Sequence, residues 1–238
     1  MGARHTRTVP SRAMEVILVR HGQPEWVRNG LNVVDPPLTD LGHQQARRLA
    51  EYLGDEHFDE ILVSPLLRAR QTAAPLLEHL GRAEVVAPWL EEIRDPAWAG
   101  TPVEKAEKAY AEMRERAPDD RWRGLDEGES VRDFVDRIHL GVELFLAERG
   151  VRRTADELPV WDIDNPDQKI LLIAHAGTNS VSIGHMLGLH PTPWEWDRFV
   201  LMHTSVSRLE SMPVGSHHAF TLTRLADVEH LGTSERTR

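Results

Sequence analysis

The chain has 238 residues, of which 40% are hydrophobic and 28% are charged, and its formal net charge is -10 at neutral pH. These values are ordinary for a globular protein with a sizeable core. The acidic balance argues against a general binder of nucleic acid or membrane surfaces. The absence of cysteine excludes disulfides, thiolate-bound metals and a cysteine nucleophile. No apolar run reaches the ~18 residues of a membrane span.

The sequence predicts one domain between two tails. Residues 1–13 are basic and hydroxyl-rich, and no apolar segment follows them, so we expect a disordered tail rather than a secretory signal. We assign residues 14–230 to an α/β domain and residues 231–238 to a C-terminal tail. No internal repeat or linker divides the domain, and we expect the protein to be cytoplasmic.

The first predicted strand ends in a polar motif. Four consecutive apolar residues, Val16 to Val19, are typical of a strand buried on both faces, and Arg20-His21-Gly22 follow directly. Ligands bind at the carboxyl ends of strands in open α/β sheets. An arginine fork matches phosphate, histidine is a potential nucleophile, and glycine lets the backbone approach a ligand closely.

Two further strands end in the same way. After a polar loop, Thr39 is a plausible N-cap for a helix that ends at Gly54. Residues 60–64 then form the second strand, and Ser64-Pro65 predict the start of a helix whose first turn contains Arg68.

The second half of the chain alternates helices, loops and strands. We expect a short strand at 85–87, a charged covering helix at 102–117 and an amphipathic helix at 130–149, the two helices with nearby loops forming a lid. Residues 152–168 predict a surface excursion without clear structure. The third buried strand, 169–174, precedes His175 and a helix that ends near Leu187. Two strand-like pieces, 205–209 and 219–225, are expected at a sheet edge.

Alternating strands and helices place the three strand ends on one side of a parallel sheet. Arg20, His21, Arg68 and His175 are therefore expected to converge there. A single arginine or histidine after a strand is usually a surface residue. Four at the same topological position are much less readily a coincidence.

The ordered motifs resemble the histidine phosphatase superfamily, in the branch with an Arg-His-Gly motif that includes the phosphoglycerate mutases. The motifs are Leu-Val-Arg20-His21-Gly22, Asp35-Pro-Pro37-Leu38-Thr39-Asp-Leu-Gly42, Ser64-Pro65-Leu-Leu-Arg68-Ala-Arg-Gln71-Thr72-Ala73, Gly128-Glu129-Ser130 with Arg137, and Ala174-His175-Ala-Gly177. The resemblance extends from about residue 15 to residue 210. It implies a phosphoglycerate mutase-like fold, a three-layer α/β/α sandwich with a mostly parallel central sheet.

The resemblance also implies roles for these residues. His21 is similar to the family's nucleophile, whose ring nitrogen attacks phosphorus and forms a phosphohistidine. Arg20, Arg68 and His175 resemble the family's phosphate pocket, and their chemistry fits that task because they can neutralise charge on the equatorial oxygens. The backbone amides of Ala176 and Gly177, at a helix N-terminus, can add donors. No metal and no cofactor are expected.

The general acid is assigned by the segment Leu90-Glu91-Glu92-Ile93. It resembles a family segment that places the acid at Glu92. Glu91 is the competing neighbour, and successive side chains diverge in an extended chain, so only one of the two can face the pocket. We favour Glu92.

Other positions depart from the family pattern. Many members carry Glu-Thr or Glu-Ser after the first motif and an asparagine six residues past the nucleophile, where this chain has Gln23-Pro24 and Val27. We include Gln23 and the nearby Asn29 as candidate phosphate-binding residues. After the general acid, Pro96 and Ala99 replace a glycine and a second glutamate of the family, which affects substrate recognition.

The sequence therefore predicts a metal-independent phosphomonoesterase of the histidine acid phosphatase type, acting on a small phosphorylated metabolite. One alternative is a mutase-type phosphotransferase, which we disfavour because the basic loop after the general acid is poor. The other is a catalytically inactive binding or scaffold member of the family, disfavoured by retention of the chemical residues. We expect a small phosphorylated substrate as partner, no nucleic acid, no membrane and a homo-oligomer as an open possibility.

Overall fold

The computed structural model of the chain describes residues 13–154 and 158–238. The strands are β1 (Glu15–Arg20), β2 (Val27–Arg28), β3 (Leu31–Asn32), β4 (Glu60–Val63), β5 (Val151–Arg153), β6 (Trp161–Ile163), β7 (Lys169–Ala174), β8 (Val206–Val214) and β9 (His217–Asp227). The α-helices are α1 (Asp40–Leu53), α2 (Leu67–Leu80), α3 (Val103–Glu115), α4 (Val131–Ala147), α5 (Ala176–Met186) and α6 (Glu195–Arg198). Short 3-10 helices cover Pro88–Leu90, Pro118–Arg123 and Thr233–Glu235.

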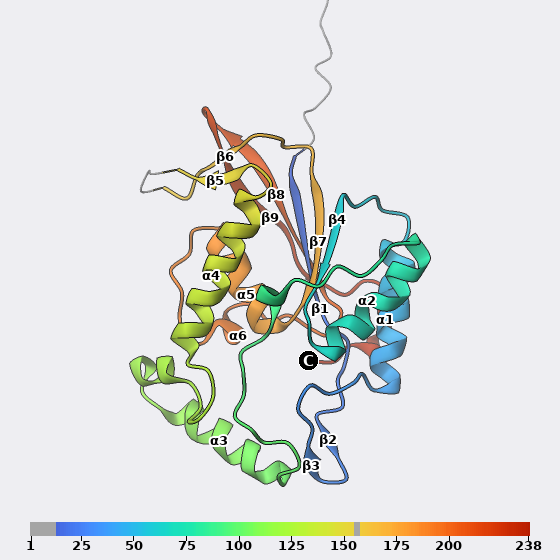
Figure 1. Cartoon of the computed structure of the whole chain (residues 1–238), viewed down its shortest axis with the longest axis vertical. Coiled ribbons are helices and arrows are strands. Elements are labelled where there is room, and N and C mark those ends of the chain that lie inside the picture. Colours follow the sequence, from blue (N-terminus) through green and yellow to red (C-terminus); the bar gives the residue numbers. More distant parts are fainter. Residues whose placement is uncertain (1–12, 155–157) are drawn as a thin grey trace, which may run out of the picture.

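The main sheet has the strand order β4-β7-β1-β8-β9-β6-β5 (Figure 1). β1 and β4 both pair with β7 in parallel, whereas β8, β9, β6 and β5 continue the sheet in antiparallel pairs. The change of direction lies between β1 and β8. A two-residue turn at 215–216 then joins β8 to β9, and so short a connection makes that pair antiparallel as well. The predicted α/β fold is confirmed, and its parallel part consists of the three strands that end at the polar motifs.

Helices cover both faces of this sheet, which gives the predicted three layers (Figure 1). Successive side chains of a strand point to opposite faces. Val16 and Leu18 of β1 accordingly pack into the core beside α4 and α5. Ile17 and Val19 pack into the core beside α1 and α2. The two cores hold the carboxyl ends of β1, β4 and β7 in a fixed arrangement.

Several local expectations are confirmed and others are wrong. Thr39 caps α1, because its side chain accepts a hydrogen bond from the Gly42 amide. Ser64 does not cap α2, which begins at Leu67, and its hydroxyl contacts His175 instead. Residues 85–87 contribute only an isolated bridge between Val86 and Val63.

The outer half of the sheet was misjudged from the sequence. The region 152–168 is not without structure, since it contains most of β5 and all of β6, which pair with each other. β8 and β9 lie inside the sheet rather than at its edge. Short charged strands such as Val151–Arg153 have only a weak pattern of hydrophobic residues by which to be predicted. β8 is internal because β9 and β6 extend the sheet beyond it.

A strap of chain lies beyond the carboxyl ends of the parallel strands (Figure 1). It contains the β2-β3 hairpin and α3, none of whose residues is buried. The two parts are joined by Asn32, whose side-chain amide donates to the carbonyl oxygens of Thr101 and Pro102 at 3.2 and 2.9 Å. The hairpin and the start of α3 therefore form one connected unit.

The two predicted tails differ in what the structure describes. The expectation for residues 1–13 falls on residues outside the described part of the chain, apart from Ala13. Residues 231–238 pack against the domain, where Leu231 is buried and the Glu235 carbonyl accepts from Gln45 Nε2 at 2.6 Å. Along residues 13–154 and 158–238, no helix is both long and apolar enough to cross a membrane.

Candidate active site

The structure brings the four predicted residues together. β1 ends at Arg20, which lies beside Ala174 in the register with β7, so His21 and His175 follow side by side. Their ring centroids are 5.1 Å apart. Arg68 lies in the first turn of α2, directly after β4, and its Nε approaches His21 Nε2 at 3.3 Å. The residues that follow the three parallel strands therefore lie together, as the topology predicts.

The ring of His21 is held in one tautomer. Its Nδ1 lies 2.7 Å from the carbonyl oxygen of Gly22, which can only accept, so Nδ1 carries the proton. Burial, followed by the charges of Arg68 and the neighbouring site residues, lowers the pKa of His21 well below its usual range. The ring is therefore neutral, and its Nε2 lone pair faces Arg68.

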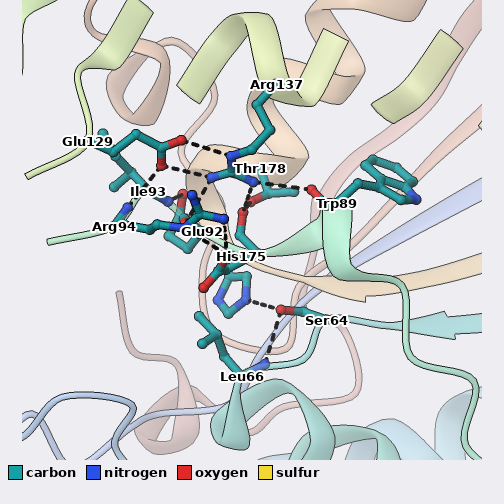
Figure 2. Close-up of polar contacts among 11 residues, drawn as sticks. Ser64, Leu66, Trp89, Glu92, Ile93, Arg94, Glu129, Arg137, His175 and Thr178 are labelled. Carbon is teal, nitrogen blue, oxygen red and sulfur yellow. Dashed lines mark hydrogen bonds and ion pairs between the residues drawn. The ribbon is translucent and has the colours of Figure 1, made fainter. Parts of the chain in front are cut away.

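His175 is oriented by Ser64 (Figure 2). The Ser64 hydroxyl accepts from the Leu66 amide at 3.4 Å and lies 2.7 Å from His175 Nε2. Burial and the charges of Arg68 and Arg20 lower the pKa of His175, so its ring is neutral. The hydroxyl then donates to Nε2, and the proton of the ring lies on Nδ1, which is buried without a hydrogen-bond partner.

Arg20 is anchored by Leu201 and by His203, whose ring centroid lies 5.6 Å from that of His21. Its Nη1 donates to the Leu201 carbonyl at 2.6 Å and its Nη2 to His203 Nε2 at 3.1 Å, while Nε is buried without a partner. Burial lowers the pKa of Arg20 to about 10, so the guanidinium stays charged near neutral pH. Arg20 Nε and His175 Nδ1 are unpartnered donors of the kind that an anion satisfies.

Two of the supporting residues were not found from the sequence. His203 accepts from Arg20 and therefore carries its own proton on Nδ1, which lies 2.8 Å from Thr237 Oγ1. His203 lies just before β8, and β8 pairs with β1. That position is the feature of the sequence that could have indicated its closeness to Arg20. Ser64 was noticed only as a helix cap.

Glu92 lines the same cavity as Arg68. Its Oε2 accepts from the Gly177 amide at 2.8 Å and its Oε1 from the Ile93 amide at 3.0 Å. Burial raises the pKa of Glu92, and the two amides and the arginines oppose that rise. Glu91 points elsewhere, since its carboxylate pairs with Arg94 at 2.7 Å. Both residues line the cavity, but only the Glu92 carboxylate lies at the start of α5.

The two amides at the start of α5 have different surroundings. Gly177 N–H is bonded to Glu92, whereas Ala176 lines the cavity in front of His21. Position 177 also requires glycine, because a Cβ there would lie 2.4 Å from the Trp196 ring and 2.6 Å from Glu92 Oε1. The close contact lets the Glu92 carboxylate reach the helix N-terminus.

Gln23 and Asn29 are not brought to the pocket. Gln23 Oε1 accepts from the Thr39 hydroxyl at 2.8 Å, so its side chain supports the start of α1. Asn29 occupies the exposed turn between β2 and β3 with φ of 53°. Neither lines the cavity beside His21, although Trp26 and Val27 of the same loop do.

A cavity of about 850 Å³ extends from Arg20 and His21 to the strap. Its inner end contains Arg20, His21, Arg68, Glu92 and Ala176. Its outer walls include the rings of Trp26, Trp98 and Tyr110 and the charged side chains of Arg94, Asp95, Glu107 and Arg114. The Trp196 ring lies beside Gly177, and the Asp35 carboxylate lies 3.7 Å from the Arg68 guanidinium. A volume of this size accommodates a small organic molecule. Among the residues that the structure describes, no three His, Asp or Glu side chains form a group that could hold a metal ion.

Known proteins resemble this chain over most of its length. A phosphoserine phosphatase of Hydrogenobacter thermophilus is 33% identical over 135 residues, which are 52% of this chain and 61% of that protein. A "probable phosphoglycerate mutase" of Photorhabdus laumondii is 28% identical over 200 residues, covering 83% of this chain and 85% of its own length. The solved structure of a mycobacterial glucosyl-3-phosphoglycerate phosphatase is 26% identical, has a TM-score of 0.68, and covers 91% of this chain and 100% of its own.

The family model of the histidine phosphatase superfamily, branch 1, matches residues 16–224. That range includes every residue placed at the inner end of the cavity, and it agrees with the resemblance in the sequence motifs. The chain belongs to the histidine phosphatase superfamily.

Proposed function

We propose that the protein is a phosphomonoesterase that hydrolyses a small phosphorylated metabolite through a phosphohistidine on His21. The observation that carries the proposal is the neutral His21 ring and its surroundings. Its Nε2 lone pair lies beside the charged guanidinium groups of Arg20 and Arg68 and the neutral ring of His175, all of which can donate hydrogen bonds. Such a ring is a nucleophile, and these donors are placed to stabilise charge on a phosphoryl group.

The first step forms a bond between His21 Nε2 and phosphorus and breaks the bond between phosphorus and the ester oxygen. The leaving oxygen takes its proton from the Glu92 carboxyl, whose pKa burial raises. Arg20, Arg68 and the His175 Nδ1–H hold the equatorial oxygens.

The second step releases phosphate. Glu92, now a carboxylate, takes a proton from a water molecule as its oxygen bonds to phosphorus, and the bond to His21 Nε2 breaks. Inorganic phosphate leaves, and Glu92 and His21 return to their starting states. The two guanidinium groups supply the positive charge that this chemistry requires, so we propose that it needs no metal ion or cofactor.

The comparisons support a small phosphorylated substrate, since similar proteins are named for phosphoserine and glucosyl-3-phosphoglycerate. A mutase-type phosphotransferase is the second candidate, because a similar protein carries a mutase name over 83% of this chain. Against it, Arg94 is already paired with Glu91, and aromatic rings rather than free cations dominate the outer cavity walls. The inactive scaffold is the third candidate, and retention of the complete catalytic set argues against it. The domain limits, a cytoplasmic location and a homo-oligomer stay predictions.

A screen of phosphorylated metabolites in the presence of EDTA tests the proposal. We expect release of inorganic phosphate without transfer to a second metabolite, and acid-labile, base-stable label on His21 after quenching with radiolabelled substrate. Loss of activity on chelation, with recovery on adding a divalent ion, contradicts the metal-free mechanism. Transfer to an organic acid favours the mutase, and an inert wild-type protein favours the scaffold.

A further inference from the structure

Arg137 of α4 holds the backbone of the segment that carries Glu92 (Figure 2). Its Nη1 donates to the carbonyl oxygens of Trp89 and Glu91 at 3.4 and 3.0 Å, and its Nη2 to that of Glu92 at 3.3 Å. Its Nε and Nη2 also donate to the two carboxylate oxygens of Glu129, both at 2.8 Å. All five N–H donors of this guanidinium are thus used.

Glu129 completes the attachment from the other side of the segment. Its Oε2 accepts from the Arg94 amide at 3.1 Å, and its own backbone amide donates to the Arg94 carbonyl at 2.8 Å. Gly128 permits this approach, because a Cβ there would lie 3.0 Å from the Arg94 carbonyl oxygen. The side chains of Glu129 and Arg137 are 10% and 20% exposed, so solvent screens the pair little.

Residues 89–94 have no regular structure after the short helix that ends at Leu90, so no helix or sheet ladder fixes the Glu92 backbone. α5 adds one contact, from the Thr178 hydroxyl to the Glu91 carbonyl at 3.3 Å. The Glu92 side chain is held separately, by the Gly177 and Ile93 amides. Arg137 and Glu129 touch neither the carboxylate of Glu92 nor the phosphate-binding groups.

We propose that Arg137 and Glu129 are positioning residues that keep the Glu92 carboxyl where it can protonate the leaving oxygen. This inference rests on the proposed function, because it assumes that Glu92 is the general acid. Proton transfer requires hydrogen-bond contact with the reacting oxygen, and misplacement by about 1 Å can cost up to about 100-fold in rate. The pair acts on proton transfer and leaves phosphate binding intact.

The test compares substrates that differ in their need for an acid. Arg137→Lys keeps the positive charge but loses the planar fork, and Glu129→Gln keeps the shape but loses the charge. We expect each to lower kcat for glycerol phosphate by about 10- to 100-fold, and kcat for p-nitrophenyl phosphate by less than about threefold. Affinity for inorganic phosphate should stay at the wild-type value.

Arg132→Lys is the matched control, since Arg132 lies on the same helix and stacks on Trp122 away from the segment. It should leave both rates unchanged. Glu92→Gln, measured alongside, separates the two proposals. If Glu92→Gln lowers both rates equally, the general-acid assignment fails. Suppose instead that Glu92→Gln slows glycerol phosphate far more than p-nitrophenyl phosphate. The positioning role is then wrong if Arg137→Lys and Glu129→Gln lower neither rate, or lower both only in proportion to the folded fraction.

Discussion

At the scale of single residues, the site depends on where protons lie. The Gly22 carbonyl fixes the proton of His21 on Nδ1, and the Ser64 hydroxyl fixes that of His175 on its own Nδ1. One ring therefore presents a lone pair and its neighbour presents a donor, although both belong to the same residue type. Such a division requires both rings to be neutral, as burial and the adjacent arginines ensure by lowering both pKa values.

His21→Ala is expected to abolish turnover while the protein stays folded and still binds inorganic phosphate weakly. His21 supplies only the attacking nitrogen, whereas Arg20, Arg68 and His175 hold the anion. Isothermal titration calorimetry with inorganic phosphate measures binding to the variant, and a phosphate-release assay measures its turnover. Arg68→Ala is the informative comparison, because it should weaken binding and turnover together. Turnover of His21→Ala close to that of wild type would exclude the phosphohistidine.

Glu92→Gln should slow hydrolysis of alkyl phosphates by at least about 100-fold and affect p-nitrophenyl phosphate far less. A poor leaving group needs a proton, and a good one leaves nearly unaided. Glu91→Gln is the control, since Glu91 pairs with Arg94 and should change either rate little. A larger loss in Glu91→Gln than in Glu92→Gln would reverse the assignment.

The sequence located the residues that follow buried strands and missed those that support them. Arg20, His21, Arg68 and His175 were predictable because parallel strands bring their carboxyl ends together. Ser64 and His203 were harder, because their partners are 111 and 183 residues away along the chain. Gln23 and Asn29 were candidates because they lie at or near positions where the family carries a glutamate and an asparagine, and the departure from that pattern goes with side chains that do not line the cavity.

At the scale of elements, the C-terminal segment supports the phosphate pocket. Thr237 Oγ1 accepts a hydrogen bond from Gln45 Nε2 at 2.9 Å and lies 2.8 Å from Nδ1 of His203. The other ring nitrogen of His203, Nε2, accepts a hydrogen bond from Arg20. The order of the last residues is thereby linked to the orientation of a phosphate-binding guanidinium. The sequence could not show this, because residues 231–238 have no apolar periodicity.

Thr237→Val is expected to raise the KM for phosphate esters and to weaken binding of inorganic phosphate by about fivefold, which corresponds to about 1 kcal/mol for a lost hydrogen bond. The reason is that His203 Nδ1 loses the acceptor that holds the ring in place against Arg20. Thr233→Val is the control, because Thr233 is exposed in the same segment. Equal constants for the two variants would show that the segment is irrelevant to Arg20.

The strands also show the limit of pattern-based prediction. β1 and β7 are apolar throughout their interiors, so their identity and burial were predictable. β5 and β6 have three residues each and owe their structure to pairing partners, β6 with β9 and β5 with β6. The antiparallel half of the sheet follows from that pairing and leaves little trace in hydrophobic periodicity.

At the scale of the whole molecule, buried neutral histidines couple stability to pH. Burial lowers the pKa of His139 and of His185 to about 4, and that of His203 to about 3. An unfolded histidine has a pKa of about 6.5, so below that pH the unfolded chain binds protons that the native protein does not. The free energy of unfolding therefore falls as pH decreases from about 6.5 toward about 4.

We expect His185 and His203 each to remove up to about 1 kcal/mol from the free energy of unfolding per pH unit in that window, and the more exposed His139 to remove less. Glu92 and Asp95, whose pKa values are raised by burial, act in the opposite direction and offset part of the loss. Urea unfolding at pH 7.5, 6 and 5 measures the slope. His139→Asn should make it shallower, since the ring packs 4.3 Å from His185 among Asp136, Glu143 and Arg153. An unchanged slope in this variant would contradict the explanation.

The two walls of the cavity differ in how the chain holds them. Ten residues of α5, from Gly177 to Met186, are buried, whereas α3 buries none. Amide hydrogens enclosed in a core exchange with solvent only through large openings, and those of an exposed segment exchange through small local ones. The amide that holds Glu92 should accordingly exchange among the slowest, and the amides of α3 among the fastest. Substrate can then enter and product can leave by displacement of the outer wall, while the atoms that perform the chemistry stay in register.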